Sequence, residues 1–86
     1  MSWRLAVAKR AQKNLDRFPL RDHERITAAL DKLTLNPHAH TVKHLKPGST
    51  LFSMRVGNYR ILFDIVSDYR LITVHSIERR SSTTYR

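Results

Sequence analysis

The chain has 86 residues, of which 41% are hydrophobic, enough for one compact core and too few for two. We therefore expect a single domain over residues 1–86. The absence of cysteine excludes disulfides, thiolate nucleophiles and cysteine-ligated metal sites. No segment approaches the ~20 apolar residues of a membrane span, and the N-terminus lacks the apolar stretch of a signal peptide. We expect a cytoplasmic protein without a membrane partner.

Sixteen Lys and Arg residues stand against seven Asp and Glu, a formal charge of +9. Residues 1–42 hold 8 basic and 4 acidic residues, and residues 43–86 hold 8 and 3, so the charge belongs to the whole surface and not to a tail. This predicts a folded binder of a polyanion, nucleic acid first, with an acidic protein as a compatible partner. The alternative is that the excess arginine only aids solubility.

The first half of the chain predicts one strand and two helices. Residues 3–7 are short, apolar and partly alternating, which indicates a strand. Apolar residues then recur at helical spacing, which predicts helices over 8–18 and 21–35. Pro19 ends the first and Asn36-Pro37 the second. The short connection favours an antiparallel helical hairpin.

The second half predicts a sheet. Three runs, 51–56, 58–66 and 69–77, are rich in β-branched and aromatic residues, and short turn-like connections separate them. We expect an antiparallel meander. The stretch around Val42 and Leu45 fits no element clearly.

The predicted order β-α-α-β-β-β is typical of an α+β fold with both helices on one face of an antiparallel sheet and the other face open. Strand alternation directs these side chains to the core: Phe52, Met54, Val56, Tyr59, Ile61, Phe63 and Ile65. Arg55 and Arg60 then share the open face, together with Asp64. The pattern leaves the side of His75 undecided.

Two arginines on an uncovered face predict a phosphate site, because a guanidinium is always charged and its donors match phosphate oxygens. An arginine near a scissile phosphate also stabilises the charge of a pentacoordinate transition state. The alternative is that both are ordinary solvated strand residues.

The segment from Leu51 to Phe63 resembles the Leu-aromatic-x-x-Arg-x-Gly-x-Tyr-Arg-x-x-aromatic block of the RelE/ParE toxin superfamily. The similarity extends to other segments: Ala11 to Leu15 with Phe18-Pro19, Leu33 with Asn36-Pro37, Lys43 to Gly48, and Arg79-Arg80 before Tyr85. It covers nearly the whole chain.

The resemblance implies the toxin of a type II toxin–antitoxin system, neutralised in a hetero-oligomer by a protein antitoxin that wraps it. RelE-like members cleave messenger RNA in the ribosomal A site. They use the RNA's own 2′-hydroxyl as nucleophile and leave a 2′,3′-cyclic phosphate. The resemblance implies no metal and no cofactor.

Four residues are candidates for three catalytic positions of the superfamily. Arg60 matches the arginine that stabilises the scissile phosphate. Arg79 or Arg80 matches the basic residue that assists the phosphate or leaving group, and Tyr85 matches the tyrosine that stacks on the cleaved nucleotide.

RNA-binding roles are expected for four further residues. Arg55 matches a substrate-contacting position, and Lys43 and Lys46 lie in the segment similar to the Lys-Leu-x-Gly stretch of the superfamily. His75 joins them if it faces outward.

The general base is not identified by the resemblance. Leu51 and Ser53 occupy positions where the best-known RelE-like pattern has lysines, and no glutamate lies between Glu24 and Glu78, where other branches have one. Imidazole titrates near physiological pH, so the histidines are candidates: His75, His44, His38 and His40. His75 is preferred if it lies beside Arg60. The pair at 38 and 40 lacks a carboxylate or cysteine and makes a weak metal site.

Two other functions are compatible with the sequence. A ParE-like protein shares the fold, poisons DNA gyrase and needs no catalytic residues, and the missing lysines favour it. The arginines and Tyr85 favour a ribonuclease. A non-catalytic RNA-binding module is supported by charge alone.

Overall fold

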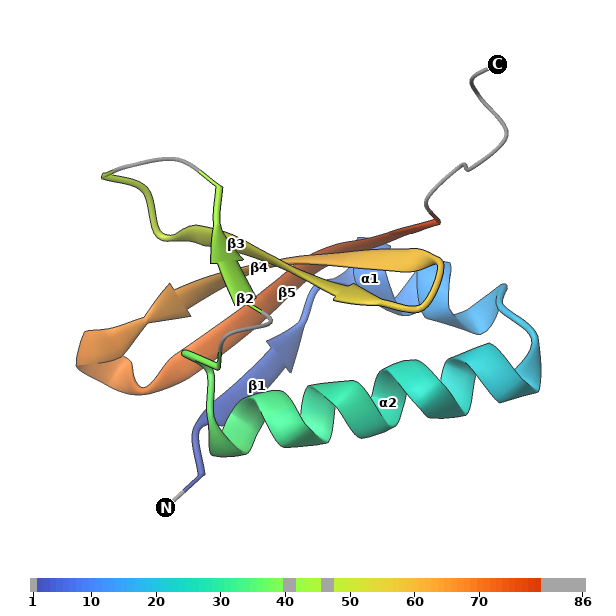
Figure 1. Ribbon diagram of the computed structural model, residues 1–86, viewed down its shortest axis with the longest axis horizontal. Coiled ribbons are helices and arrows are strands. Elements are labelled where there is room, and N and C mark those ends of the chain that lie inside the picture. Colours follow the sequence, from blue (N-terminus) through green and yellow to red (C-terminus); the bar gives the residue numbers. More distant parts are fainter. Residues whose placement is uncertain (1, 40–41, 46–47, 80–86) are drawn as a thin grey trace.

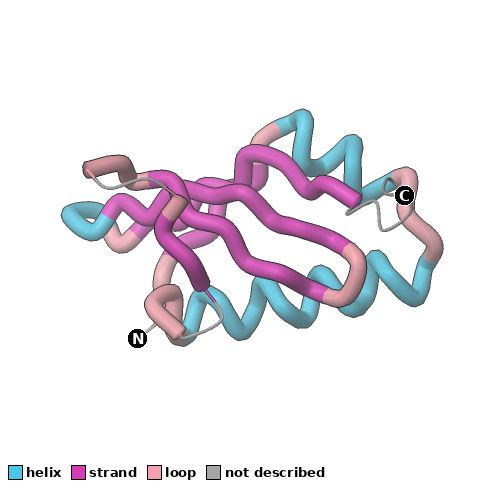
Figure 2. The backbone as a smooth tube through the Cα atoms, turned by 45° about the horizontal axis from the view of Figure 1, so that its top comes forward, coloured by secondary structure: helices cyan, strands magenta, loops and turns pink. Residues whose placement is uncertain are grey.

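A computed structural model describes residues 2–39, 42–45 and 48–79. Five strands form one sheet in the order β1-β5-β4-β3-β2, and two helices lie against one of its faces (Figures 1 and 2). The elements are β1 (Arg4–Val7), α1 (Lys9–Asp16), α2 (Leu20–Leu35), β2 (Val42–His44), β3 (Leu51–Val56), β4 (Tyr59–Val66), the 3-10 turn η1 (Ser67–Tyr69) and β5 (Leu71–Arg79). The predicted α+β class, with both helices on one face, is confirmed.

The sheet is mixed, whereas the sequence predicted an antiparallel one. Strands β2 to β5 are antiparallel neighbours, but β1 pairs with β5 in parallel, from Arg4 opposite Leu71 to Val7 opposite Val74. Strand β2, which the sequence pattern did not assign, pairs with β3 over three residues. A strand this short gains its order from its neighbour, so its own sequence carries little signal.

The last strand begins two residues later than predicted and ends two residues later. The turn η1 takes up residues 67–69, and Arg70 follows in the left-handed region with φ 51°. The chain therefore reverses over four residues before β5 begins at Leu71.

The core lies between the helices and the sheet. Ala11 and Leu15 of α1 are buried, as are three residues of α2 at helical spacing, Ile26, Leu30 and Leu33. They cover a sheet face made by Met54, Tyr59, Ile61, Phe63, Ile65, Ile72, Val74 and Ile77, all buried. The predicted inward set of β3 and β4 is confirmed, and Phe52 and Val56 pack at its margin.

One polar contact ties α2 to the sheet. The phenol of the buried Tyr59 donates a hydrogen bond to Asp22 Oδ2 at 2.7 Å. The ring centres of Tyr59 and Phe18 are 4.4 Å apart. Pro19 separates the helices, because its ring fixes φ and it lacks an N–H donor. Neither described helix is long and apolar enough to cross a membrane.

Candidate nucleic-acid interface

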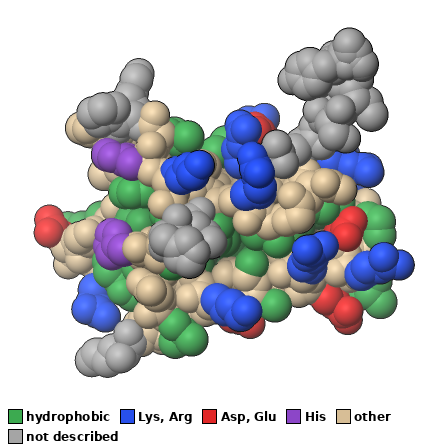
Figure 3. Space-filling view, in the orientation of Figure 1, with side chains coloured by type: hydrophobic (Ala, Val, Ile, Leu, Met, Phe, Trp, Pro, Cys, Tyr) green, Lys and Arg blue, Asp and Glu red, His purple; other side chains and the backbone are tan. Residues whose placement is uncertain are grey.

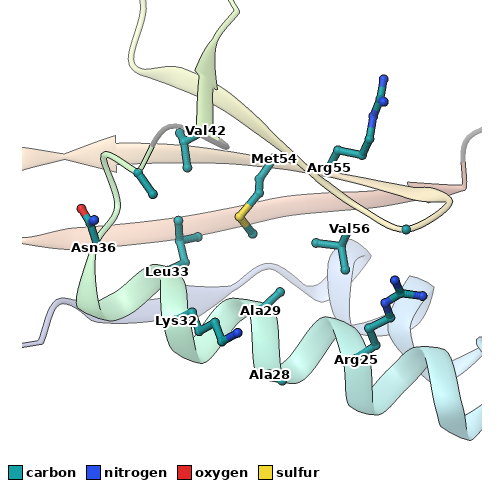
Figure 4. Close-up of a pocket in the computed structure, with 12 residues that line it drawn as sticks. Arg25, Ala28, Ala29, Lys32, Leu33, Asn36, Val42, Met54, Arg55 and Val56 are labelled. Atoms are coloured by element: carbon teal, nitrogen blue, oxygen red, sulfur yellow. The ribbon is translucent and has the colours of Figure 1, made fainter.

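The open face of the sheet carries a row of three charged side chains. Arg55 on β3 lies directly opposite Arg60 on β4, and Arg60 lies directly opposite Glu78 on β5. All three are exposed. In Figure 4 the Arg55 side chain points away from α2, as the alternation predicts. We call these three residues the arginine row.

The turn that follows β3 sets this register. Gly57 has φ 58° at the first of the two turn positions, which a two-residue hairpin of type II′ requires and glycine supplies without strain. The hairpin then fixes Val56 opposite Tyr59 and Arg55 opposite Arg60. The two arginines are therefore held on rigid elements two positions from a tight turn.

The facing pair Arg55 and Arg60 within the arginine row is electrostatically unfavourable on its own, and a bound anion would relieve it. Like charges directly opposite each other on a sheet destabilise it. Within the part of the chain that the structure describes, neither Arg55 nor Arg60 makes an ion pair with a carboxylate. Both guanidinium groups are free to bind a phosphate, whose charge would remove the repulsion.

Lys43 extends this cationic surface. It lies on β2 opposite Ser53, which in turn lies opposite Leu62 on β4, so it belongs to the next row of the same face. It is exposed. Two residues along a strand span about 6–7 Å, which places Lys43 roughly one nucleotide step from the arginine row.

Arg79 does not join the arginine row. It pairs with Tyr59 at the end of β5, and alternation places it on the side of Tyr59, away from Arg60. Its positive charge acts to lower the pKa of the Tyr59 phenol, but that pKa is nonetheless raised, chiefly by the hydrogen bond to Asp22 and then by burial. Three other predicted site residues, Arg80, Tyr85 and Lys46, lie outside the described residues.

His75 faces outward, but against Asp64 and not beside Arg60. Its Nε2 lies 2.5 Å from Asp64 Oδ2, and Asp64 Oδ1 accepts a hydrogen bond from Thr50 Oγ1 at 2.9 Å. On β4 the consecutive Leu62 and Phe63 pair with Ser76 and Val74, so His75 is the extra residue of a β-bulge. The neighbour of Arg60 on β5 is Glu78.

Two other candidate histidines, His38 and His44, belong to an aromatic cluster at the far end of β3. His44 stacks on Phe52 with ring centres 4.6 Å apart, and its Nε2 contacts the Ser49 carbonyl oxygen. The His38 ring lies edge-on to the Trp3 ring, with ring centres 6.0 Å apart. His40 is outside the described residues. Among those described, no group of three or more His, Asp or Glu side chains could hold a metal ion.

A groove of about 560 Å³ separates α2 from β3 (Figure 4). Its floor is apolar, made mainly by Ala29, Leu33, Val42, Met54 and Val56. Arg25 and Lys32 of α2 stand at its rim. The floor of this groove is on the helix side of the sheet, and Arg55 of the arginine row borders the groove at its edge.

Basic side chains also gather on α1. Lys9, Arg10, Lys13 and Arg17 line a shallow hollow of about 380 Å³ with Asn14, whose Oδ1 accepts a hydrogen bond from the backbone N–H of Ile77. Figure 3 shows lysine and arginine side chains spread over much of one face of the molecule. The positive charge is thus distributed, as the sequence predicted.

Sequence reasoning missed two pairings on this surface. Alternation predicts Asp64 on the open face, but it does not predict the contact with His75, because a bulge cannot be read from the pattern. Glu78 lies one residue beyond the predicted end of its strand, so its position opposite Arg60 was not foreseen.

No family model matches the chain. RelE1 of Methanocaldococcus jannaschii is 25% identical over 83 residues, which cover 93% of this chain and 92% of that protein. The chain is therefore similar in sequence to a RelE protein over nearly its whole length.

Solved structures carry the fold comparison. RelE in the RelE–RelB complex of Pyrococcus horikoshii OT3 has a TM-score of 0.83 at 23% identity, covering 96% of this chain and 100% of that one. The RelBE2 toxin–antitoxin complex of Mycobacterium tuberculosis has a TM-score of 0.82 at 22% identity, and the match covers 93% of this chain and 100% of that one. The isolated RelE toxin of E. coli has a TM-score of 0.83 at 14% identity, and the match covers 96% of this chain and 89% of that one. The RelE-like fold of this chain is therefore established.

Proposed function

We propose that this protein is the toxin of a type II toxin–antitoxin system and acts as an endoribonuclease on messenger RNA in the ribosomal A site. The observation that carries the proposal is the pair Arg55 and Arg60 of the arginine row, two guanidinium groups without an ion pair that face each other on the uncovered side of a RelE-like sheet. The net charge of +9 suits docking on ribosomal RNA. The action is cytoplasmic, where translating ribosomes are found.

The proposed chemistry is attack of the RNA's 2′-hydroxyl on the adjacent phosphorus, which gives a 2′,3′-cyclic phosphate and a 5′-hydroxyl. Arg60 binds the scissile phosphate in a bidentate manner and stabilises the charge that builds up in the transition state. Arg55 and Lys43 hold the neighbouring phosphates. Arg80 and Tyr85 keep the roles that the superfamily resemblance implies, whereas alternation places Arg79 on the opposite side of the sheet from Arg60.

A protein antitoxin is the proposed partner, since the similar structure from Mycobacterium tuberculosis is a toxin–antitoxin complex and that from Pyrococcus horikoshii is a RelE–RelB complex. The α2–β3 groove is a suitable dock for part of it. Its apolar floor and the cations Arg25 and Lys32 fit an amphipathic segment with acidic flanks. A stable complex should bury about 1,200 Å² or more in total.

The ribonuclease proposal is tested by primer extension on messages carried by translating ribosomes. After induction of the wild-type protein, primer extension should detect cleavage of the message at discrete positions within codons, and after induction of Arg60→Gln it should not. Coexpression with the product of the neighbouring gene should restore growth, and the two proteins should copurify. Separate elution at micromolar concentration would refute that choice of partner.

A ParE-like gyrase inhibitor is the second candidate, favoured by Leu51 and Ser53 at positions where the best-known RelE-like nucleases have lysines. Growth arrest with intact messages and inhibited gyrase supercoiling would assign the chain to that branch.

A further inference from the structure

The arginine row contains a carboxylate that the proposed function leaves without a role. The pairing of β4 with β5 is regular from Tyr59 opposite Arg79 to Leu62 opposite Ser76, and the bulge begins only beyond this point. Glu78 therefore projects on the same side as Arg60. Side chains directly opposite each other on a sheet have Cβ atoms about 4.5–5.5 Å apart. A phosphate bound by Arg60 would have the Glu78 carboxylate beside it.

We propose that Glu78 is the general base of this ribonuclease, an inference that rests on the function proposed above. The superfamily resemblance left this role vacant, because the side chains of Leu51 and Ser53 on β3 carry no group basic enough to take the proton of the 2′-hydroxyl. Glu78 supplies the group from β5, on the other side of Arg60. The site would then have its base and its charge stabiliser on adjacent strands.

The step balances without a metal or an oxidant. A carboxylate oxygen of Glu78 takes the proton of the 2′-hydroxyl while O2′ forms a bond to phosphorus and the bond from phosphorus to O5′ breaks. A water molecule protonates the departing O5′, and the proton held by Glu78 neutralises the hydroxide so formed. Arg60 holds the two non-bridging oxygens throughout.

Two features favour Glu78 over the other candidate base, His75. The Nε2 of His75 is engaged by Asp64, and the register places Glu78, not His75, opposite Arg60. Within the described part of the chain, the carboxylate of Glu78 makes no ion pair, although Arg60 is its direct neighbour. An unpaired carboxylate beside two cations weakens RNA binding, so its presence in an RNA site calls for a role other than binding.

The test compares four purified proteins, wild type, Glu78→Gln, His75→Gln and the matched control Glu24→Gln, which changes an exposed carboxylate on α2. Single-turnover cleavage is measured on ribosome–message complexes. Affinity is measured separately with a message carrying a 2′-deoxy nucleotide at the cleavage site, which binds but cannot react. Thermal melting establishes that each variant is folded.

We expect Glu78→Gln to cleave about 10²–10⁴-fold more slowly, to bind the uncleavable message at least as tightly as wild type, and to melt as wild type does. Glu24→Gln should match wild type in both assays. Cleavage by Glu78→Gln within threefold of wild type would overturn the inference, as would parallel losses of cleavage and affinity, or a larger loss for His75→Gln. Absence of cleavage by the wild-type protein would instead overturn the ribonuclease proposal and this inference with it.

Discussion

Replacing Arg60 with glutamine should abolish activity while leaving the fold intact. Arg60 has an arginine on one side and a glutamate on the other, so its charge is repelled by Arg55 and attracted by Glu78. Each cross-strand charge pair is worth roughly 0.2–1 kcal/mol, and the two effects oppose each other. The free energy of unfolding should therefore change by less than about 1 kcal/mol.

The loss of activity should be far larger than the change in stability. Removing one preorganised donor from a developing anion typically costs about 10²–10³ in rate, whereas 1 kcal/mol of stability shifts the melting temperature of a domain this size by only ~4–8 °C. The assays are primer extension on translating ribosomes and thermal melting of each protein. Arg21→Gln is the control, because it removes an exposed arginine on α2 and changes the net charge equally. Persistent cleavage by folded Arg60→Gln would refute the role of Arg60.

Three other changes test the surroundings of the arginine row. Arg55→Gln should raise the free energy of unfolding by ~0.2–1 kcal/mol, because it relieves repulsion with Arg60, and should weaken RNA binding; a loss of stability on urea unfolding would contradict this. Gly57→Ala should lower the free energy of unfolding by roughly 1–2 kcal/mol, since L-residues resist positive φ. The added Cβ would lie 3.1 Å from Arg25 Nη1, which is the flexible end of a side chain and can move aside. An unchanged melting temperature would contradict this prediction. Folding raises the pKa of Tyr59, chiefly because its hydroxyl donates a hydrogen bond to Asp22. The stability that this hydrogen bond contributes is complete below the unfolded pKa of 10.0 and is lost as the pH rises through the folded pKa. Tyr59→Phe should be less stable than wild type at pH 7 by ~1–2 kcal/mol, and the gap should narrow above pH 10; a constant gap in urea unfolding would exclude this linkage.

Much of the fold was predictable because it follows from periodicity. The helical spacing of Ile26, Leu30 and Leu33 and the alternation around Tyr59 and Ile61 each assign a buried face, and all five residues are buried. Burial of one face fixes strand register strongly, since a slip of one residue would expose the whole apolar set.

The features that the sequence did not predict depend on partners distant in the chain. The parallel pairing of Arg4–Val7 with β5 and the short strand Val42–His44 are decided by the edges that β5 and β3 offer. The bulge at His75 similarly depends on the β4 register. Propensity says little about such choices, because strand preference is largely a matter of neighbours.

The candidate site shows the same division. Arg55 and Arg60 could be placed on the open face from alternation alone, and the two-residue turn at Gly57 then brings them opposite each other. Glu78 could not, because the end of its strand and the bulge before it shift which side each β5 residue takes. Whether Arg80 and Tyr85 complete the site stays a prediction.

The adjacent pair Tyr59-Arg60 links stability to the proposed chemistry. Successive residues of a strand point to opposite faces, so Tyr59 is buried and bonded to Asp22 of α2 while Arg60 projects from the uncovered side. The buried phenol fixes the backbone one residue before Arg60, and the hairpin fixes the pairing of Arg60 with Arg55 of β3. A site that must hold a phosphate within a fraction of an ångström needs this kind of support. The order tyrosine then arginine thus gives one strand position for the core and the next for the substrate.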